Sequence, residues 1–479
     1  MAITPVFDVA TRALHAQELV IRTTGHNLAN VNRPGYSRQR VELTSERPTQ
    51  FTPLVIGNGV RVETVRQIVD PIVERQLLLA RSASAHSSTA RDELARLEQL
   101  VAELDGTGLQ NGLDAFFAAA ADVALHPQGG PERTVFLARA ESLAASARGR
   151  EGSLGELQRQ VDDRVVAVLP RINGLLDNIA RLNGEIATSE INGHTANDLR
   201  DQRQEALGEL STLVGIAQFE AEDGVTVLGP DGILLVDGVR STHLVGDTST
   251  APALLGLDGR GLTRVGFAVG GGGFVEFTNP VDGGELGGLL GVRDADIPAT
   301  AASLDQFAVA LRTAVNAVHT SGEDLDGNAG VALFGGSGAG DLAVLITDPR
   351  LVAASAATGA APNTPEDNSN ALDLAALAST ALDGTDPTVG NADLGGQTFT
   401  GFISSIIADV GTITETAGTR AEASEALTSQ LEAQRSAVSG VNTDEELTGL
   451  LEAQRAYQAA AMLVTVATAT VDALLEMAE

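Results

Sequence analysis

Cysteine, tryptophan and lysine are absent from the 479-residue chain, and aromatic residues make up only 3% of it. Without cysteine, the chain has no disulfide framework and no thiolate for chemistry. Alanine and valine must therefore supply most of the packing. The start of the chain lacks a basic segment followed by a continuous apolar run, and no run of about 18 apolar residues occurs. The sequence thus predicts neither a cleaved signal peptide nor a membrane-spanning helix.

Positive charge is also scarce. All 31 basic residues are arginines, and they stand against 63 carboxylates, so the formal net charge is -32. A chain this acidic repels nucleic acid and anionic lipid, and we expect neither a nucleic acid nor a membrane as its partner. We expect the carboxylates to lie mainly on outer domains, as a solvated surface that keeps single molecules apart.

Motifs for catalysis and metal binding are missing, since no GxSxG, HExxH or Walker sequence occurs. The segment "DLDGNAG" from Asp324 is similar to a calcium loop, but Ala329 and Gly335 replace the glycine and glutamate that such loops require. The acidic pair Asp162 and Asp163 is expected to face solvent on a helix. We therefore predict no enzyme, no cofactor and no metal site. Seven histidines lack metal-ligand spacing: His15, His26, His86, His126, His194, His243 and His319.

At both ends of the chain, apolar residues recur at alternating spacings of three and four, which predicts the seam of a coiled coil. Such a stripe is too narrow to hold an isolated helix, because a helix in water is stabilised mainly by packing one face. We predict that the two ends pair and then pack against neighbouring molecules; an ordinary intramolecular bundle is the alternative. The predicted interface residues are Phe7, Leu14, Ile21, Leu28, Leu447, Leu450, Tyr457, Val464, Val471 and Leu475.

Long helices are predicted between the two ends. Asp70 followed by Pro71 is a typical start signal, with an N-cap and a proline at the first helical position. A further apolar seam runs from Val161 to Ile186, where Pro170 is expected to kink the helix. A shorter seam covers residues 304–318.

The pattern changes in residues 216–284, where short alternating apolar runs are split by Asp-Gly and glycine-rich turns, and Gly270–Gly273 indicates a hairpin. This indicates an inserted antiparallel β domain in a mainly α fold. We therefore predict nested halves. Residues 1–40 and 441–479 form a terminal coiled-coil domain, and residues 41–215 and 285–440 form a long-helix bundle domain that includes a mixed segment, 325–400.

Residues 27–41 read "NLANVNRPGYSRQRV" and contain a predicted helix stop. Pro34 disfavours helical geometry at the residue before it, and Pro34-Gly35 suits the centre of a type II turn. Asn30 and Asn32 tolerate capping or left-handed geometry. Tyr36, one of only two tyrosines, is expected to pin this turn against a helix.

This stretch resembles the signature near the N-terminus of bacterial flagellar axial proteins, and Tyr36 followed by Ser-Arg-Gln is most similar to the hook-associated protein 1 family. Three further segments resemble the same family in the expected order. They are "ANDLRDQRQEALGELSTLVGI" at 196–216, "GGELGGLLGVRD" at 283–294, and the C-terminal signature that begins with Ser-Gly-Val-Asn at 439–442.

The resemblance implies a structural subunit at the hook-filament junction, exported by the flagellar type III route without a cleaved signal peptide and located outside the cell. It implies terminal helices that are disordered before assembly and coiled together afterwards. The implied partners are copies of itself in a ring, hook subunits, a second hook-associated junction protein and an export chaperone at the C-terminal helix. A hook or distal-rod subunit remains an alternative, as does a secreted adhesin or enzyme that binds a ligand through the β insertion.

Overall fold

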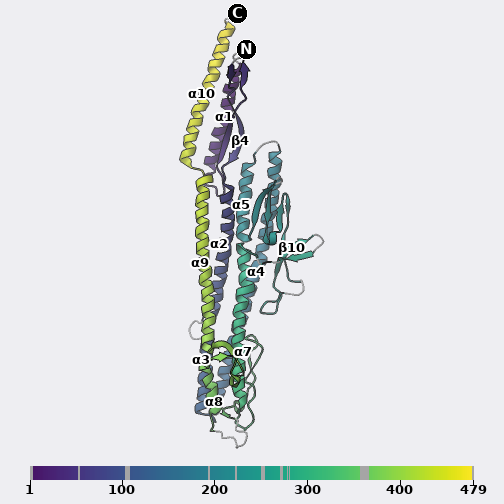
Figure 1. Ribbon diagram of the computed structural model, residues 1–479, viewed down its shortest axis with the longest axis vertical. Coiled ribbons are helices and arrows are strands. Elements are labelled where there is room, and N and C mark those ends of the chain that lie inside the picture. Colours follow the sequence, from purple (N-terminus) through teal and green to yellow (C-terminus); the bar gives the residue numbers. More distant parts are fainter. Residues whose placement is uncertain are drawn as a thin grey trace.

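The structure is a computed structural model. It describes residues 4–51, 54–102, 108–191, 195–221, 224–249, 254–269, 273–277, 279, 281–356 and 366–476, without the side chains of 4–5, 49–51, 54–56, 269 and 474–476. The predicted interface residue Leu475 and the predicted hairpin residues 270–272 thus lie outside the described side chains or residues. The molecule is elongated, and both chain ends lie at one tip (Figure 1).

Long helices form most of the molecule. Helix α1 at the N-terminus lies beside α10 at the C-terminus, and a bundle built on α2, α4, α5, α7 and α9 extends away from them (Figure 1). None of the described helices is both long and apolar enough to cross a membrane. The bounds are α1 Thr4–Ala29, α2 Pro71–Val101, α3 Leu109–Leu125, α4 Gly130–Glu190, α5 Asn197–Leu213, α6 Gly284–Gly291, α7 Ile297–Ser321, α8 Ser369–Ala376, α9 Phe399–Ser439 and α10 Thr443–Glu476.

The predicted helix starts and seams are confirmed in the bundle. The carboxylate of Asp70 accepts hydrogen bonds from the backbone N–H groups of Ile72 and Val73 at the start of α2. Helix α4 continues through Pro170 as one element. Its predicted seam is buried apart from Leu175, which is partly exposed.

Phenylalanines close the core at the end of the bundle far from the chain termini. Their side chains come from α3, α4, α7, α9 and the loop strand β13 (Phe334–Gly335), and neighbouring ring centroids lie 5.1 to 5.9 Å apart. These few aromatic residues are thus concentrated where the most elements meet. The residues are Phe116, Phe117, Phe136, Phe307, Phe334 and Phe399.

Antiparallel strands fill the predicted insertion, so the mainly α fold with a β insertion is confirmed. One sheet has the order β5-β6-β7-β8 and the other β11-β10-β9. Asn183 of α4 fixes the first sheet, because its side chain bonds both N–H and C=O of Val225. The strands are β5 Ala217–Ala221, β6 Gly224–Leu228, β7 Leu234–Asp237, β8 Arg240–Ser241, β9 Leu244–Asp247, β10 Arg264–Val269 and β11 Gly273–Glu276.

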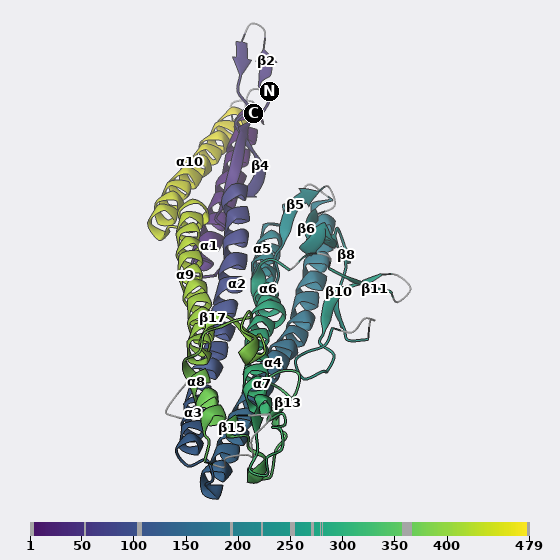
Figure 2. The ribbon, with the colours of Figure 1, turned by 60° about the horizontal axis from the view of Figure 1, so that its bottom comes forward.

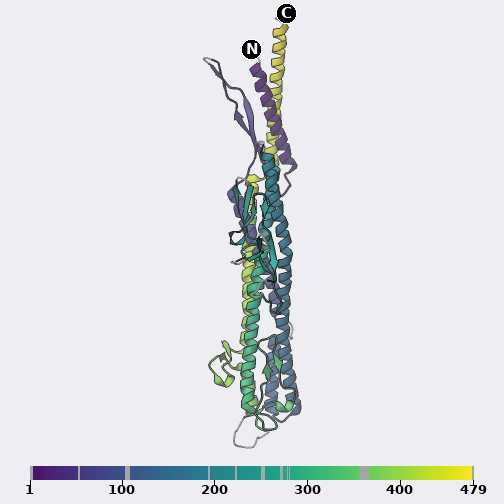
Figure 3. The same cartoon turned by 90° about the vertical axis from the view of Figure 1, so that its right-hand side faces the viewer.

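Small two-stranded sheets occupy the two remaining parts of the chain. After α1, β1 (Gln39–Ser45) pairs with β4 (Val60–Gln67), and β2 (Thr49–Phe51) with β3 (Leu54–Ile56), in a hairpin that extends beside the terminal helices (Figure 3). The described parts of the mixed segment contain the pairs β12 (Gly322–Glu323) with β15 (Ser355–Ala356), β13 with β14 (Ala343–Val344), and β16 (Leu382–Asp383) with β17 (Asp393–Gln397).

The prediction that Asp162 faces solvent is wrong. Asp162 is buried on α4, and its Oδ1 accepts a 2.6 Å hydrogen bond from Nη1 of Arg293, which is itself 1% exposed. The same carboxylate accepts from the N–H and hydroxyl of Thr263. Arg293 lies in a π-helical turn, Val292–Asp296, between α6 and α7. This ion pair therefore ties the β insertion to the point where the bundle resumes.

We predict that Asp162→Ala lowers the free energy of unfolding by about 2 kcal/mol, because it removes one of the two carboxylates that bind the buried Arg293 and leaves the N–H and hydroxyl of Thr263 without their acceptor. The adjacent Asp163 is exposed, so Asp163→Ala is the matched control and should change stability by less than about 0.5 kcal/mol. Chemical denaturation measures both values. Equal effects of the two substitutions would contradict this role of Asp162.

Candidate functional site at the junction of the chain ends

The turn predicted after α1 forms at Arg33–Tyr36. Gly35 has a φ of +79°, a left-handed value that glycine adopts readily, and the N–H of Tyr36 donates to the C=O of Arg33 at 3.3 Å. Asn30 bonds back into the helix, because its Nδ2 donates to the C=O of His26 at 2.9 Å. Asn32 is exposed. The turn reverses the direction of the chain, so that β1 runs back beside α1.

Tyr36 is 7% exposed and lies on α1. Its hydroxyl donates to Oδ1 of Asn27 at 2.8 Å, and the same oxygen accepts from the N–H of Gln39 at 3.0 Å. Burial, with the nearby carboxylates Asp198, Asp201 and Glu446, raises the pKa of Tyr36, so the hydroxyl stays a donor. Tyr36 thus holds the start of β1 against the helix that precedes it.

Asn27, together with Arg38, also holds the start of α10. Nδ2 of Asn27 donates to Oε2 of Glu446 at 3.0 Å, and Nε of Arg38 donates to Oε1 of Glu446 at 2.6 Å. The N–H of Arg38 donates to the C=O of Ser439 at 2.8 Å, where α9 ends. Both oxygens of the buried Glu446 are therefore satisfied by residues more than 400 positions away in the sequence. These contacts fix the angle between α9 and α10, and they hold both helices against the N-terminal turn.

Asp201 connects helix α5 to the residues that follow the turn and to β4. Its carboxylate accepts from the N–H of Ser37 at 3.2 Å and from Nε2 of Gln67 at 2.8 Å. Burial raises the pKa of Asp201 to about 6 despite these hydrogen bonds. On the other side of the turn, Arg435 of α9 donates to the C=O of Gly35 at 2.9 Å and to Glu74 of α2 at 2.6 Å.

We call this cluster the junction network: Asn27, Tyr36, Ser37, Arg38, Gln39, Asp201, Arg435 and Glu446. It brings together α1, β1, α5, α9 and α10, and with them three of the four sequence signatures. The fourth signature lies along the bundle. There Gly284 has a φ of +66° against the backbone of Val214, and Glu285 pairs with Arg164 and Arg171 of α4.

The terminal helices contact each other through small side chains. On α10 the buried residues are Glu446, Ala453, Ala460 and Ala467, spaced by seven, and on α1 they include Ala10. The buried seam of α10 is offset by one residue from the predicted one. The predicted interface residues Phe7, Leu14, Ile21, Leu28, Leu450, Val464 and Val471 are partly exposed, whereas Leu447 and Tyr457 are exposed.

Large apolar side chains lie mainly on the side of α10 that faces away from the buried alanines. At 100° per residue, Leu451 and Met462 fall opposite the alanines, Leu447 and Val466 lie to either side of these two, and Leu463 lies closest to the alanine seam. All five are more than 40% exposed, and Met462 is 71% exposed. We call these five residues the outer face of α10. From Ala453 to Val471, Arg455 is the only charged residue of the helix, so this outer face is an apolar surface on an acidic protein.

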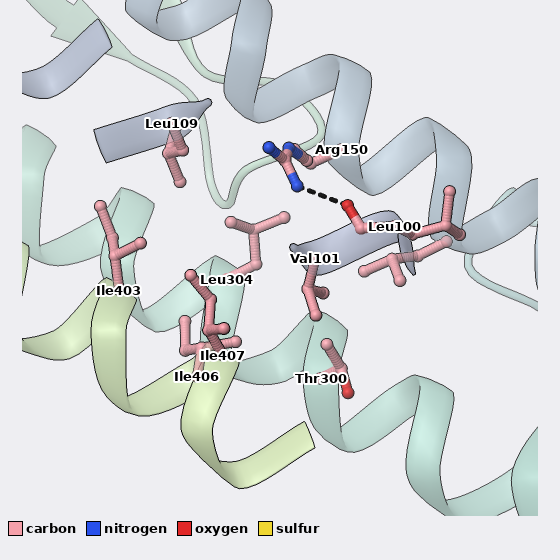
Figure 4. Close-up of a pocket in the computed structure, with 10 residues that line it drawn as sticks. Leu100, Val101, Leu109, Arg150, Thr300, Leu304, Ile403, Ile406 and Ile407 are labelled. Carbon is pink, nitrogen blue, oxygen red and sulfur yellow. Dashed lines mark hydrogen bonds between the residues drawn. The ribbon is translucent and has the colours of Figure 1, made fainter. Parts of the chain in front are cut away.

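Two open grooves lie beside α1, one of about 800 Å³ against β4 and the start of α5, and one of about 610 Å³ against β1 and α10. The bundle itself holds a much smaller space. A cavity of about 40 Å³ lies between α2, α4, α7 and α9, lined mainly by Leu304, Ile403, Ile407 and other apolar side chains (Figure 4). It is far smaller than the usual 300 to 1,000 Å³ of ligand pockets. Its one charged side chain, Arg150, donates to the C=O of Leu100. No group of three potential metal ligands occurs among the described residues.

Sequence comparison identifies the family. The profile of the flagellar hook-associated protein FlgK helical domain matches residues 94–334, half of the chain. The chain belongs to the flagellar hook-associated protein 1 family. A second profile, the C-terminal region of flagellar basal body rod FlgEFG proteins, matches residues 432–477. As a family member, the protein is a structural subunit of the flagellar hook-filament junction.

Characterised relatives align along nearly their full length. Flagellar hook-associated protein 1 of Salmonella typhimurium is 26% identical, over 98% of this chain and 99% of the relative. The Bacillus subtilis protein of the same name is also 26% identical, over 96% and 95%. The structure of the flagellar hook junction protein FlgK from Burkholderia pseudomallei matches with a TM-score of 0.65 at 17% identity, covering 76% of this chain and all of that one. The last match supports the shared fold.

Some residues of this family member could not be identified from the sequence pattern alone. Ala453, Ala460 and Ala467 recur every seven residues, which is a detectable signal, but further alanines between them at 456, 459 and 461 obscure this period. Glu446 and Asp201 gave no signal, because a carboxylate that is buried by distant parts of the chain looks like any helix-surface charge.

We predict that Tyr36→Phe lowers the free energy of unfolding by about 1 kcal/mol, since it removes the hydrogen bond to Asn27 and keeps the ring. The only other tyrosine, Tyr457, is 39% exposed, and its hydroxyl has no hydrogen-bond partner among the described residues. Tyr457→Phe is therefore the control and should change stability by less than about 0.5 kcal/mol. Denaturation of both variants provides the test; a Tyr36→Phe protein as stable as wild type would contradict it.

The raised pKa of Asp201 predicts that the free energy of unfolding depends on pH. Its folded-state pKa of about 6 exceeds the unfolded value of about 3.9, so the folded state binds more protons between them. The contribution of Asp201 to stability is therefore fully present below about pH 4 and is lost as the pH rises through 6. The side-chain amide of the Asp201→Asn variant does not titrate. From pH 4 to pH 7, the stability of this variant relative to wild type should rise by about 2 kcal/mol.

The control is Glu209→Gln, which removes one exposed charge from the same helix. Denaturation at pH 4, 5, 6 and 7 gives the stability difference between each variant and wild type. A difference for Asp201→Asn that stays constant over this range, or falls, would show that burial does not raise the pKa of Asp201.

Proposed function

We propose that the protein assembles through its terminal helices, with α1 and α10 paired inside each copy and the outer face of α10 packed against neighbouring subunits. The observation that supports this is the division of α10 into a buried alanine seam and an exposed apolar face. An exposed apolar stripe of this kind is typical of a surface that a partner covers.

Energetics favour the same arrangement. A seam of alanines buries only one methyl group at each position, worth about 0.8 kcal/mol. Ordering the backbone costs about 1 kcal/mol or more per residue over a helix of this length. The α1–α10 pair therefore needs the apolar contacts that neighbours supply. This agrees with terminal segments that become ordered only on assembly.

In this proposal the assembly interface comprises the sequence-predicted residues together with the outer face of α10. Partly exposed residues of α1 and α10 would contact neighbouring helices at their edges, and the outer face would form the centre of the contact. The sequence-predicted residues are Phe7, Leu14, Ile21, Leu28, Leu447, Leu450, Tyr457, Val464, Val471 and Leu475. The motif turn of Asn30, Asn32, Pro34, Gly35 and Tyr36 would set the position of this interface on the bundle.

The proposed partners are copies of the chain in a ring, hook subunits on one side and a second hook-associated protein on the other. We further propose export through the type III channel without a cleaved signal peptide, with a chaperone bound at α10 before assembly, and a final position outside the cell. The outer face of α10 supports a chaperone step, because an apolar helix face needs cover in a crowded cell. We propose that the role is structural and without catalysis.

We predict that Leu451→Ser with Met462→Ser reduces the fraction of exported protein retained on flagella by about tenfold or more, because two apolar contacts are lost. Both side chains are more than half exposed, so the stability of the isolated protein should not change. The matched control is Leu125→Ser with Val239→Ser, which are 73% and 66% exposed on the body of the molecule.

The measurement compares protein on purified flagella with protein in the culture medium, in a strain that carries only the variant. The control pair should be retained like wild type. If the outer-face variant is also retained like wild type, or if wild-type protein is not found on flagella, the proposal fails.

A further inference from the structure

The hairpin of β1 and β4 carries exposed arginines on one face. Arg40 pairs with Arg66 across the two strands, so both side chains lie on the same face, and Arg61 falls on that face further along β4. All three are exposed. The opposite face carries Val41 and Val62, which are partly buried where the hairpin contacts α1. We call Arg40, Arg61 and Arg66 the arginine face.

Two of the three arginines of this face have no ion-pair partner among the described side chains. Arg66 pairs with Glu42 at 3.1 Å, but Arg40 and Arg61 have no acidic partner among the side chains that the structure describes. Like charges directly opposite one another destabilise an antiparallel pair. Residues 1–67 contain eight arginines and five carboxylates, whereas the whole chain has twice as many carboxylates as arginines. The N-terminal arm is therefore the basic part of an acidic protein.

The opposite charge gathers on the two C-terminal helices. Residues 399–479, which include helices α9 and α10, contain twelve carboxylates and three arginines. Five carboxylates in residues 399–444 are exposed and form no ion pair within the described part of the chain: Asp409, Glu415, Glu422, Glu425 and Asp444. We call these five residues the acidic flank. Glu452 is left out of this set, because it lines a surface groove together with Arg40 of the same chain. The hairpin lies on one side of α1 and α10 on the other (Figures 1 and 2).

We propose that the arginine face of one copy docks on the acidic flank of the next copy, at Glu425 and Asp444 on either side of the elbow between α9 and α10. Two different surfaces of one subunit make a head-to-tail contact, which is the kind of contact that closes a ring of identical subunits. The inference rests on the proposed assembly of copies and adds to it the second surface and the charge that sets the order of neighbours. Charge pairing of this kind acts mainly on orientation and on the choice of partner.

The test reverses the two unpaired arginines, Arg40→Glu with Arg61→Glu, and measures retention on flagella as above. Retention should fall about tenfold, because attraction is replaced by repulsion across the interface. The matched control, Arg139→Glu with Arg240→Glu, reverses two arginines that are also exposed and have no ion-pair partner among the described residues. This control should be retained like wild type.

A compensating variant identifies the partner surface. Adding Glu425→Arg and Asp444→Arg to the hairpin variant exchanges the charges of the two surfaces and should restore retention to within about twofold of wild type. Loss of retention without this rescue would overturn the acidic flank as the partner and favour a surface of the hook instead. Retention of the hairpin variant at the wild-type level would overturn the docking altogether.

The two proposals fail in different ways. If the outer-face variant of α10 is lost from flagella but the hairpin variant is retained, then assembly through α10 stands and the charge contact does not. If the hairpin variant is lost and rescued while the outer-face variant is retained, then the charge contact stands without the apolar one. Circular dichroism and denaturation of each purified variant confirm that the fold is intact before retention is compared.

Discussion

The hydrogen bonds around Asn27 are the contact on which the arrangement of the whole chain depends. One amide group binds Tyr36, the backbone of Gln39 and Glu446, and so joins the end of the first helix, the start of the hairpin and the start of the last helix. Because these groups are buried, each unmade hydrogen bond would cost about 1 to 3 kcal/mol. The nested topology brings distant segments together here, and the polar contacts fix their angles.

The junction network also separates two regions with different sources of stability. Below it, α2, α4, α7 and α9 share a continuous core that ends in the cluster of phenylalanines. Above it, α1 and α10 share a seam of small residues and have little else to bury. The bundle can therefore fold as a unit within one chain, whereas the terminal pair depends on contacts beyond it. A polar junction suits this division, because its hydrogen bonds fix direction without requiring a large apolar area.

Periodicity and turn chemistry predicted much of this fold. The start of α2 at Asp70, the seam along α4 and the β insertion all follow from local patterns, and local patterns persist in the folded chain. Asp162 shows where such reasoning ends, because nothing beside it in the sequence reveals that Arg293 will bury it. Glu446 and Asp201 are similar cases. The offset of the α10 seam has another cause: alanine allows close approach of helices, and the further alanines between the buried ones obscure this signal in a search for apolar stripes.

Both termini lie at the same tip, while the turn between α3 and α4 lies towards the opposite pole (Figure 2). A fluorescent protein or an affinity tag fused to either terminus would therefore be placed beside the helices that we expect neighbouring subunits to cover. Labels intended for imaging are better inserted at the far pole, where a bulky domain would project from the assembly. The position of both termini at one tip thus determines where the molecule can be labelled.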